Sequence, residues 1–328
     1  LREFRRMGIL PQERDGYYYP VSGQASSVVD ALVRQLKLLG VKLHTEEHVH
    51  RIIPPENGQK GYQVRTDKRT YQARCVILAV GGKAAPVHGT RGDGYAMAKQ
   101  LGLNVLTPLP ALTSCVLKAK EWAKIRVKGR VSLYNKAGEL LAQDQGELQL
   151  VSYGLSGIPF FQVSRYAARA LETGDKPYLL LDILPDYSME EVGQELTRRR
   201  EAFADYPAEQ VLEGMVHKVL GRVLLKSLGM NPKTRVVEWS ERDIQRIADR
   251  FKNWKTGIAK VSGFDFAQVT TGGVLTGQLD PDTMEVKDHP GLYMTGELLD
   301  VDGICGGYNL QWAWSSGATA GIWAAKEE

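Results

Sequence analysis

The sequence is poor in cysteine, and its three cysteines, Cys75, Cys115 and Cys305, lie far apart. No C-x-x-C pair occurs, which excludes a disulfide framework, a cysteine zinc site and a redox-active dithiol of that type. No stretch reaches the ~18 continuous apolar residues of a membrane span. Residues 1–12 lack the apolar core of a signal peptide. We therefore expect a cytoplasmic protein with no membrane partner.

The sequence also lacks a strong excess of charge of one sign. Its 42 lysines and arginines face 38 aspartates and glutamates, which gives a net charge of +4. The densest basic run, residues 198–200, shares its predicted helix with Glu190, Glu191, Glu195 and Glu201. This mixture indicates a solvated helix face rather than a nucleic-acid patch. We expect a small-molecule substrate and no nucleic-acid partner, and the pattern does not indicate an oligomeric state.

The 328 residues suit two domains at about 100–200 residues each. The apolar run RCVILAVGG at 74–82 ends in two glycines and is typical of a buried parallel strand. After about residue 104, short strands separated by glycines indicate a small barrel or sandwich, and helices follow. Ser188 and Glu191 form a capping box at the start of one of these helices. We predict one domain from residues 1–104 and 258–328, interrupted by an inserted domain at 105–257.

The segments before this strand have weaker signals. Proline and glycine in the aromatic stretch 16–26 argue against regular structure there. Apolar residues at helical spacing predict a helix at 26–39, with a serine cap and a glycine stop. We expect a strand at 41–44 and another at 48–53, which leads into an antiparallel meander.

The stretch GLYMTGELLDVDGICGGYNLQWAWSSGATAG at 291–321 organises the end of the chain. A short strand ends at Gly296, an acidic glycine-rich turn follows, and a helix of small residues is predicted at 310–325. A helix N-terminus behind Gly306 and Gly307 can present backbone N–H groups to an electron-rich ligand atom. Glycine lets the backbone approach closely because it has no Cβ. The alternative is a plain buried helix behind a glycine turn.

Two further strands also end in glycines, at 76–82 and 268–273. Together with 292–296 they predict one crevice at the carboxyl ends of parallel strands. A planar flavin suits such a crevice, because backbone amides can donate to its carbonyl oxygens and a carboxylate can accept from ribityl hydroxyls.

These residues resemble the YhiN-like, or aminoacetone-oxidase-like, family of FAD-binding flavoproteins. The resemblance rests on the 291–321 motif and on GYYYPVSGQAS, VILAVGGKAAP, GDGYAMAKQLG, GELQLVSYGLSGIPFFQVSR and VTTGGV, and it covers the chain in order. It implies an α/β fold: an FAD-binding Rossmann-like domain of the glutathione-reductase-like type, interrupted by an inserted β-barrel plus helical domain. The family's opening G-x-G-x-x-G is missing here, and its βαβ unit takes about 30 residues. We expect an N-terminally incomplete FAD domain.

The resemblance also implies which residues contact FAD. They are Val49 on the adenine side; Ala79, Gly81 and Gly82 in the dinucleotide crevice; Thr271, Gly272 and Gly273 close to the flavin; Gly296, Glu297 and Asp300 along the ribityl chain or pyrophosphate; and Gly306, Gly307, Tyr308, Asn309 and Leu310 along the pyrimidine side of the ring. Tyr19 and Tyr308 are the candidates to face a substrate. We predict no metal site and no acid–base pair, since the flavin carries the hydride.

The sequence thus predicts a flavoprotein oxidoreductase that transfers a hydride between FAD and a small organic substrate. The resemblance leaves three features open: NAD(P)H as a transient co-substrate, amine oxidation with oxygen as acceptor, and reduction of an unsaturated steroid-like substrate. Because the phosphate-binding fingerprint is absent, the alternative is a non-enzymatic remnant or partner-binding module that does not hold FAD. We interpret Cys305 as a small residue in a tight turn rather than as a reactive thiol.

Overall fold

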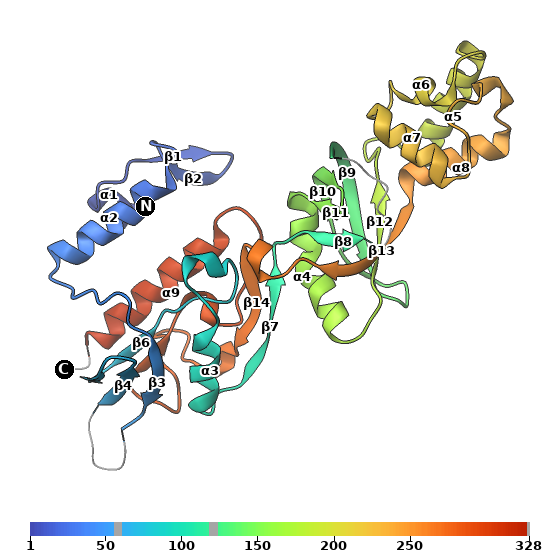
Figure 1. The fold of residues 1–328 in the computed structure, drawn as a ribbon. Coiled ribbons are helices and arrows are strands. Elements are labelled where there is room, and N and C mark those ends of the chain that lie inside the picture. Colours follow the sequence, from blue (N-terminus) through green and yellow to red (C-terminus); the bar gives the residue numbers. More distant parts are fainter. Residues whose placement is uncertain (56–60, 118–123, 327–328) are drawn as a thin grey trace.

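The computed structural model describes residues 1–55, 61–117 and 124–326. Figure 1 shows three regions in a row: the two ends of the chain together, then a barrel, then a group of helices. None of the described helices is both long and apolar enough to cross a bilayer.

The two ends of the chain meet in a parallel pair of strands. Strand β6 (Val76–Leu78) pairs with β15 (Leu292–Met294), with Val76 opposite Leu292. All three residues of β15 are buried, whereas Ile77 on β6 is 39% exposed. This region contains α1 (Arg2–Arg6), β1 (Pro11–Arg14), β2 (Tyr17–Pro20), α2 (Ala25–Leu38), β3 (Val49–Ile53), β4 (Tyr62–Thr66), β5 (Thr70–Ala73), η1 (Pro86–His88), α3 (Asp93–Gln100), η3 (Phe264–Phe266), η4 (Thr276–Gln278), η5 (Gly296–Leu298) and α9 (Tyr308–Ala324).

Strand β14 (Val269–Val274) departs from the predicted parallel arrangement. It runs antiparallel to β7 (Val105–Ala111) in a separate two-stranded sheet, so the prediction that all three glycine-ended strands are parallel is wrong for this one. The pairing register shifts between Thr271 and Gly273, where Gly272 and Gly273 have φ values of 89° and 140°. Glycine tolerates this backbone, and the bend brings the end of β14 to η5.

Six antiparallel strands close a barrel, which confirms the small barrel over the sandwich. The order around it is β10-β11-β8-β13-β12-β9. The strands are β8 (Cys115–Leu117), β9 (Ile125–Tyr134), β10 (Leu140–Val151), β11 (Gly154–Ser156), β12 (Tyr178–Asp182) and β13 (Trp254–Val261). Buried and outward-facing residues alternate along the second half of β9, as expected when one face of a strand lines a barrel core. Helix α4 (Ile158–Glu172) packs against the barrel and against β7.

The helices beyond the barrel share its hydrophobic core. They are α5 (Met189–Ala202), α6 (Ala208–Leu212), α7 (Lys218–Ser227), η2 (Val236–Glu238) and α8 (Glu241–Lys252). The capping box of α5 is confirmed, because Glu191 N donates to Ser188 Oγ at 3.1 Å and Ser188 N donates to Glu191 Oε2 at 2.7 Å. The predicted domain limits fall at the first residue of β7 and inside β13.

The N-terminal predictions need two corrections. The stretch 16–26 was expected to be irregular, but β2 forms a hairpin with β1, and Pro11 lies opposite Pro20. Both prolines sit at strand ends, where a missing N–H is tolerated. The expected strand at 41–44 is absent, since these residues are exposed and form no ladder.

The predicted helix at 26–39 is α2, but no serine caps it. Its N-cap is Gln24, without a side-chain hydrogen bond. Ser27 Oγ lies 2.9 Å from Ser22 Oγ instead.

Helix α9 is confirmed, but most of its residues are not buried. Of its residues only Ser316 and Ala320 are buried. Ala320 packs into the core with β15 and Ser316 bonds Gly296 of η5, while Trp314, Ile322 and Trp323 stay 38–58% exposed. Phe4 of α1 covers part of this outer face, with its ring 4.5 Å from that of Trp314.

Candidate functional site

Helix α9 begins with an uncapped N-terminus that faces open space. Its N-cap residue is Gly307, with φ 86° and no side-chain hydrogen bond to the first turn. A Cβ on Gly307 would meet no heavy atom within 4 Å. The first N–H groups of a helix have no partner inside it and carry its partial positive charge. The start of α9 can therefore donate to an electron-rich ligand atom.

Two tyrosines flank this helix start. A Cβ on Gly306 would lie 2.5 Å from the ring of Tyr17, so only glycine fits beneath that ring. Tyr17 and Tyr308 meet edge to face with ring centroids 6.4 Å apart, and Tyr308 is 51% exposed. Tyr19 lies further along β2, with the guanidinium of Arg14 6.0 Å from its ring centre. The structure thus places Tyr17 rather than Tyr19 beside Tyr308.

The three glycine-ended turns meet around Glu297. Glu297 Oε1 accepts from Thr270 N at 2.9 Å, and a Cβ on Gly82 would lie only 2.2 Å from that oxygen. Thr270 Oγ1 in turn accepts from Lys83 N at 2.8 Å. The turns after β6 and β15 are therefore joined through β14, although β14 is not parallel to them.

Burial raises the pKa of Glu297 above its ordinary value of 4.5. Hydrogen bonds from Thr270 act in the opposite direction, and the nearby carboxylate of Asp302 raises the pKa further. The protonated form of Glu297 therefore favours the folded protein. This contribution to the free energy of unfolding is fully present below the ordinary pKa, and it is lost as the pH rises through the folded-state pKa.

We expect Glu297→Gln to gain stability relative to the parent as the pH rises from 4 to 8. The amide oxygen can still accept from Thr270 N, and glutamine carries no charge to desolvate. Urea unfolding of both proteins across this pH range measures the difference. The same exchange at Glu285, which accepts from Gly291 N at 2.7 Å, is the matched control. A Glu297→Gln protein that becomes less stable than its parent with rising pH would contradict this account.

A second polar cluster joins the site to α4. Arg165 of α4 lies 2.8 Å from Asp302 Oδ2, and Thr271 donates to Asp302 Oδ1 at 3.0 Å. Burial raises the pKa of Asp302, while Arg165 opposes that shift. The sequence predictions did not name Arg165. Its spacing to Arg169, four residues on along a largely apolar helix, was a signal that could have found it.

The other predicted site residues fall into a packed group and an open group. Gly272, Gly273 and Gly296 are packed against protein: a Cβ on Gly272 would lie 2.5 Å from Thr107 O, and one on Gly273 would lie 2.6 Å from Leu298 O. Gly296 is tied to α9, because its N donates to Ser316 Oγ at 3.0 Å and its O accepts from Trp312 Nε1 at 3.0 Å.

The open group consists of exposed or unobstructed positions. Ala79 is exposed, a Cβ on Gly81 would meet nothing within 4 Å, and Leu310 is 57% exposed. Asn309 closes the loop before the helix by bonding Gly303 N at 2.7 Å and Gly303 O at 3.2 Å.

Val49 and Asp300 lie outside both groups. Val49 begins β3 in the separate three-stranded sheet. Asp300 N donates to Val274 O at 2.9 Å.

These features fit the ring end of a flavin. The uncapped helix start supplies donors for carbonyl oxygens, and Gly81 and Gly307 leave room for a flat ring. The 328 residues contain no G-x-G-x-x-G, so they include no phosphate cradle of that kind.

Comparison with known proteins decides the family. Residues 4–323 match the family model described as HI0933-like protein Rossmann domain. The chain belongs to the HI0933-like family. This confirms the YhiN-like resemblance and supports a Rossmann-type domain and enzyme activity of the oxidoreductase type.

Three named relatives of this HI0933-like chain fall into two kinds. It is 37% identical to 3-dehydro-bile acid delta(4,6)-reductase of Clostridium scindens, across 99% of this chain and 80% of that protein. It is 29% identical to the ribosomal RNA dihydrouridine synthase of Escherichia coli, across 93% of this chain and 72% of that protein. The Haemophilus influenzae protein of the same name is 26% identical, across 89% and 71%.

Proposed function

We propose that the protein is a flavin-dependent reductase of a carbon–carbon double bond conjugated to a carbonyl group, with a steroid-like substrate. The observation that carries this proposal is the 37% identity to a bile acid reductase along 99% of the chain. The uncapped start of α9, with its open N-cap at Gly307, supports the flavin.

The names of the two kinds of relative describe one type of chemistry. A 3-dehydro steroid with double bonds at positions 4 and 6 is a conjugated ketone. Uridine also has a ring double bond next to a carbonyl group, and dihydrouridine is its reduced form. In both cases a hydride adds to one alkene carbon and a proton to its neighbour. The higher identity to the steroid reductase favours the steroid-like substrate for this chain.

The chain's own residues would hold the ring and shield it. Gly81, Gly306 and Gly307 would let the ring approach the backbone, and the first N–H groups of α9 would donate to its carbonyl oxygens. Glu297, whose Oε1 is engaged by Thr270, keeps a second oxygen for a ribityl hydroxyl. Bound FAD supplies hydride transfer, with NAD(P)H as the reductant in this proposal.

The second half of the reaction needs a proton. Three side chains next to the Gly306–Gly307 turn carry a transferable one, namely Tyr17, Cys305 and Tyr308. Burial raises the pKa of the Cys305 thiol, with Arg165 opposing the shift. Cys305 is therefore protonated at neutral pH, but its thiol is a weaker acid than that of an ordinary cysteine, whereas a general acid works best with a pKa near the working pH.

The test is anaerobic reoxidation of reduced flavin. The purified protein is loaded with FAD, reduced with NADPH or dithionite, and mixed with a 3-oxo-4,6-diene steroid. We expect the flavin absorbance to return and the steroid mass to rise by two hydrogens. A saturated 3-oxo steroid is the control and leaves the flavin reduced.

Three other outcomes would decide against the proposal. Reoxidation by uridine-containing ribosomal RNA, with no response to the steroid, would assign the RNA chemistry of the more distant relatives. A protein that binds no FAD under any loading condition would favour the non-enzymatic alternative. Oxygen-dependent oxidation of an amine such as aminoacetone, without steroid reduction, would assign the oxidase chemistry.

A further inference from the structure

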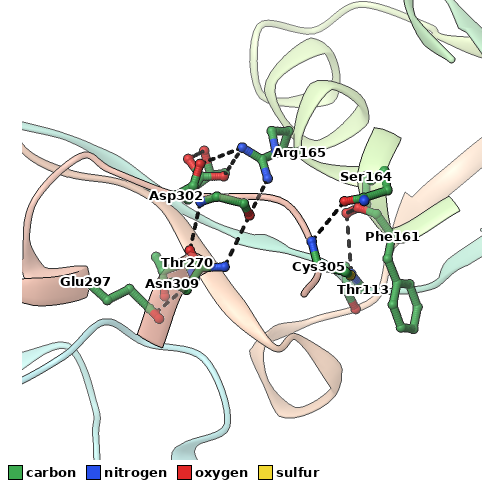
Figure 2. A network of polar contacts seen from close by, with 12 residues as sticks. Thr113, Phe161, Ser164, Arg165, Thr270, Glu297, Asp302, Cys305 and Asn309 are labelled. Carbon is green, nitrogen blue, oxygen red and sulfur yellow. Dashed lines mark hydrogen bonds and ion pairs between the residues drawn. The ribbon is translucent and has the colours of Figure 1, made fainter. Parts of the chain in front are cut away.

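One face of α4 reaches across to the loop that leads into α9. Gln162, Arg165 and Arg169 follow one another at spacings of three and four, which places them on the same side of a helix. Each bonds a backbone atom outside the barrel: Gln162 Oε1 accepts from Cys305 N at 3.1 Å, and Arg169 Nη1 donates to Thr107 O at 2.8 Å. Figure 2 shows Arg165 at the centre of this contact.

Arg165 bonds two successive carbonyl groups of this loop. Its Nη1 donates to Asp302 O at 2.7 Å and its Nη2 donates to Gly303 O at 2.6 Å. The planar guanidinium group suits such a paired arrangement, whereas a lysine ammonium does not. The side chains of Arg165 and Asp302 are only 15% and 11% exposed, so water competes little for these bonds.

The ion pair itself explains little of the stability. Asp302 Oδ2 lies 2.8 Å from Arg165 Nη1, yet it receives no in-line hydrogen bond, and Arg165 Nε also has no partner among the described residues. Desolvation offsets most of the attraction within a buried pair. The main effect of Arg165 is therefore to hold the backbone of Asp302 and Gly303 in one conformation.

We propose that Arg165 is a positioning residue that fixes residues 302–305 and thereby sets the start of α9 at the flavin site. Two further backbone groups of this loop are hydrogen-bonded: Gly303 N donates to Asn309 Oδ1, and Cys305 N donates to Gln162 Oε1. Two residues later Gly307 starts the helix. Helix α4, which packs on the barrel, thus determines where the donors of α9 point. The link to the flavin rests on the proposed function, while the fixing of the loop does not.

The reactivity of the three cysteines can report whether residues 302–305 are held in place. Cys305 lies in the fixed segment, Cys115 is fully buried in the barrel core, and Cys75 lies half-buried beside β6. Reaction with a thiol reagent, followed by peptide mass mapping across pH 6–10, gives the rate and apparent pKa of each thiol. Arg165→Met removes the paired bonds, Arg165→Lys keeps the charge, and Gln162→Ala removes one bond to the loop. Arg222→Met, which breaks the surface pair with Glu209, is the control.

We expect Arg165→Met to raise the labelling rate of Cys305 about tenfold or more, as the loss of two bonds from a charged donor implies. Burial is the largest cause of the raised pKa of Cys305, so release of the loop brings that pKa down towards its ordinary value. Arg165→Lys behaves like Arg165→Met, and Gln162→Ala shows a smaller change in the same direction. Cys75 and Cys115 keep their parent rates.

Two results would overturn the positioning role. If only the charge of Arg165 mattered, Arg165→Met would raise the pKa of Cys305 further and slow the labelling of Cys305. Arg165→Lys would then label Cys305 at the parent rate. If Cys115 reacted faster together with Cys305, the variant would be globally unfolded and Gln162→Ala would decide instead; no selective rise in Cys305 labelling in Gln162→Ala would then overturn the positioning role. The labelling needs neither flavin nor substrate, so its outcome is independent of the steroid assay. In the same variants, FAD affinity should fall with the rise in Cys305 labelling.

Discussion

Replacement of Lys252 by methionine should cost about 3–5 kcal/mol of stability, as expected when one partner of a buried ion pair is removed. Lys252 Nζ lies 2.7 Å from Asp182 Oδ2 and donates to Leu184 O at 2.8 Å and to Tyr187 O. One ammonium group thus serves three acceptors where β12 leaves the barrel. Methionine keeps the volume of the stem, but it leaves the Asp182 carboxylate without its cation.

Lys128→Met is the matched control for this prediction. Lys128 also lies 2.7 Å from an aspartate, Asp186, but the two side chains are 63% and 53% exposed. Such a pair is worth about 0–1 kcal/mol. Urea unfolding followed by tryptophan fluorescence measures both variants. Equal losses for the two would show that burial does not set the strength of these pairs.

The double variant Asp182→Asn with Lys252→Met separates charge from packing. If the loss comes from the unpaired carboxylate, the double variant recovers part of it. Recovery would show that the cost of the single substitution comes from the uncompensated carboxylate rather than from loss of the contact itself.

Local signals in the sequence predicted the elements whose structure is decided locally. The capping box at Ser188, the helices that follow it and the hairpin of β9 and β10 all depend on near neighbours in the chain. The expected strand at 41–44 was wrong because a strand needs a partner, and periodicity within four residues does not report one. The orientation of β14 is likewise decided by its pairing with β7, more than 150 residues away.

The residues of the candidate site also differ in whether a local sequence pattern indicates them. Gly306 and Gly307 could be found from the sequence, because a glycine pair before an apolar helix is a local pattern. Tyr17 could not, because a folded hairpin brings it to the turn from far along the chain. The spacing of Arg165 and Arg169 marks one face of a helix, but it does not indicate that this face contacts the turn. Glu297 was named through the resemblance, but its contact with Thr270 depends on β14.

Replacement of Gly307 by valine should weaken flavin binding by about 10–100-fold, because one hydrogen bond to a charged or strongly polar acceptor is worth about 1.5–3 kcal/mol. The open space at Gly307 is where we place the ring, and a branched side chain there covers the first N–H groups of α9. Flavin fluorescence titration gives the dissociation constants of variant and parent.

Gly138→Val controls for the backbone strain that this substitution adds. Gly138 lies in the turn between β9 and β10 with φ 89°, against 86° for Gly307. The nearest atom to a Cβ there is Tyr178 Oη at 3.9 Å. Each valine costs about 1–2 kcal/mol of stability for a left-handed backbone, so the two variants should melt alike. If both then bind FAD as the parent does, the flavin ring does not lie at the start of α9, whereas selective loss in Gly307→Val locates it there.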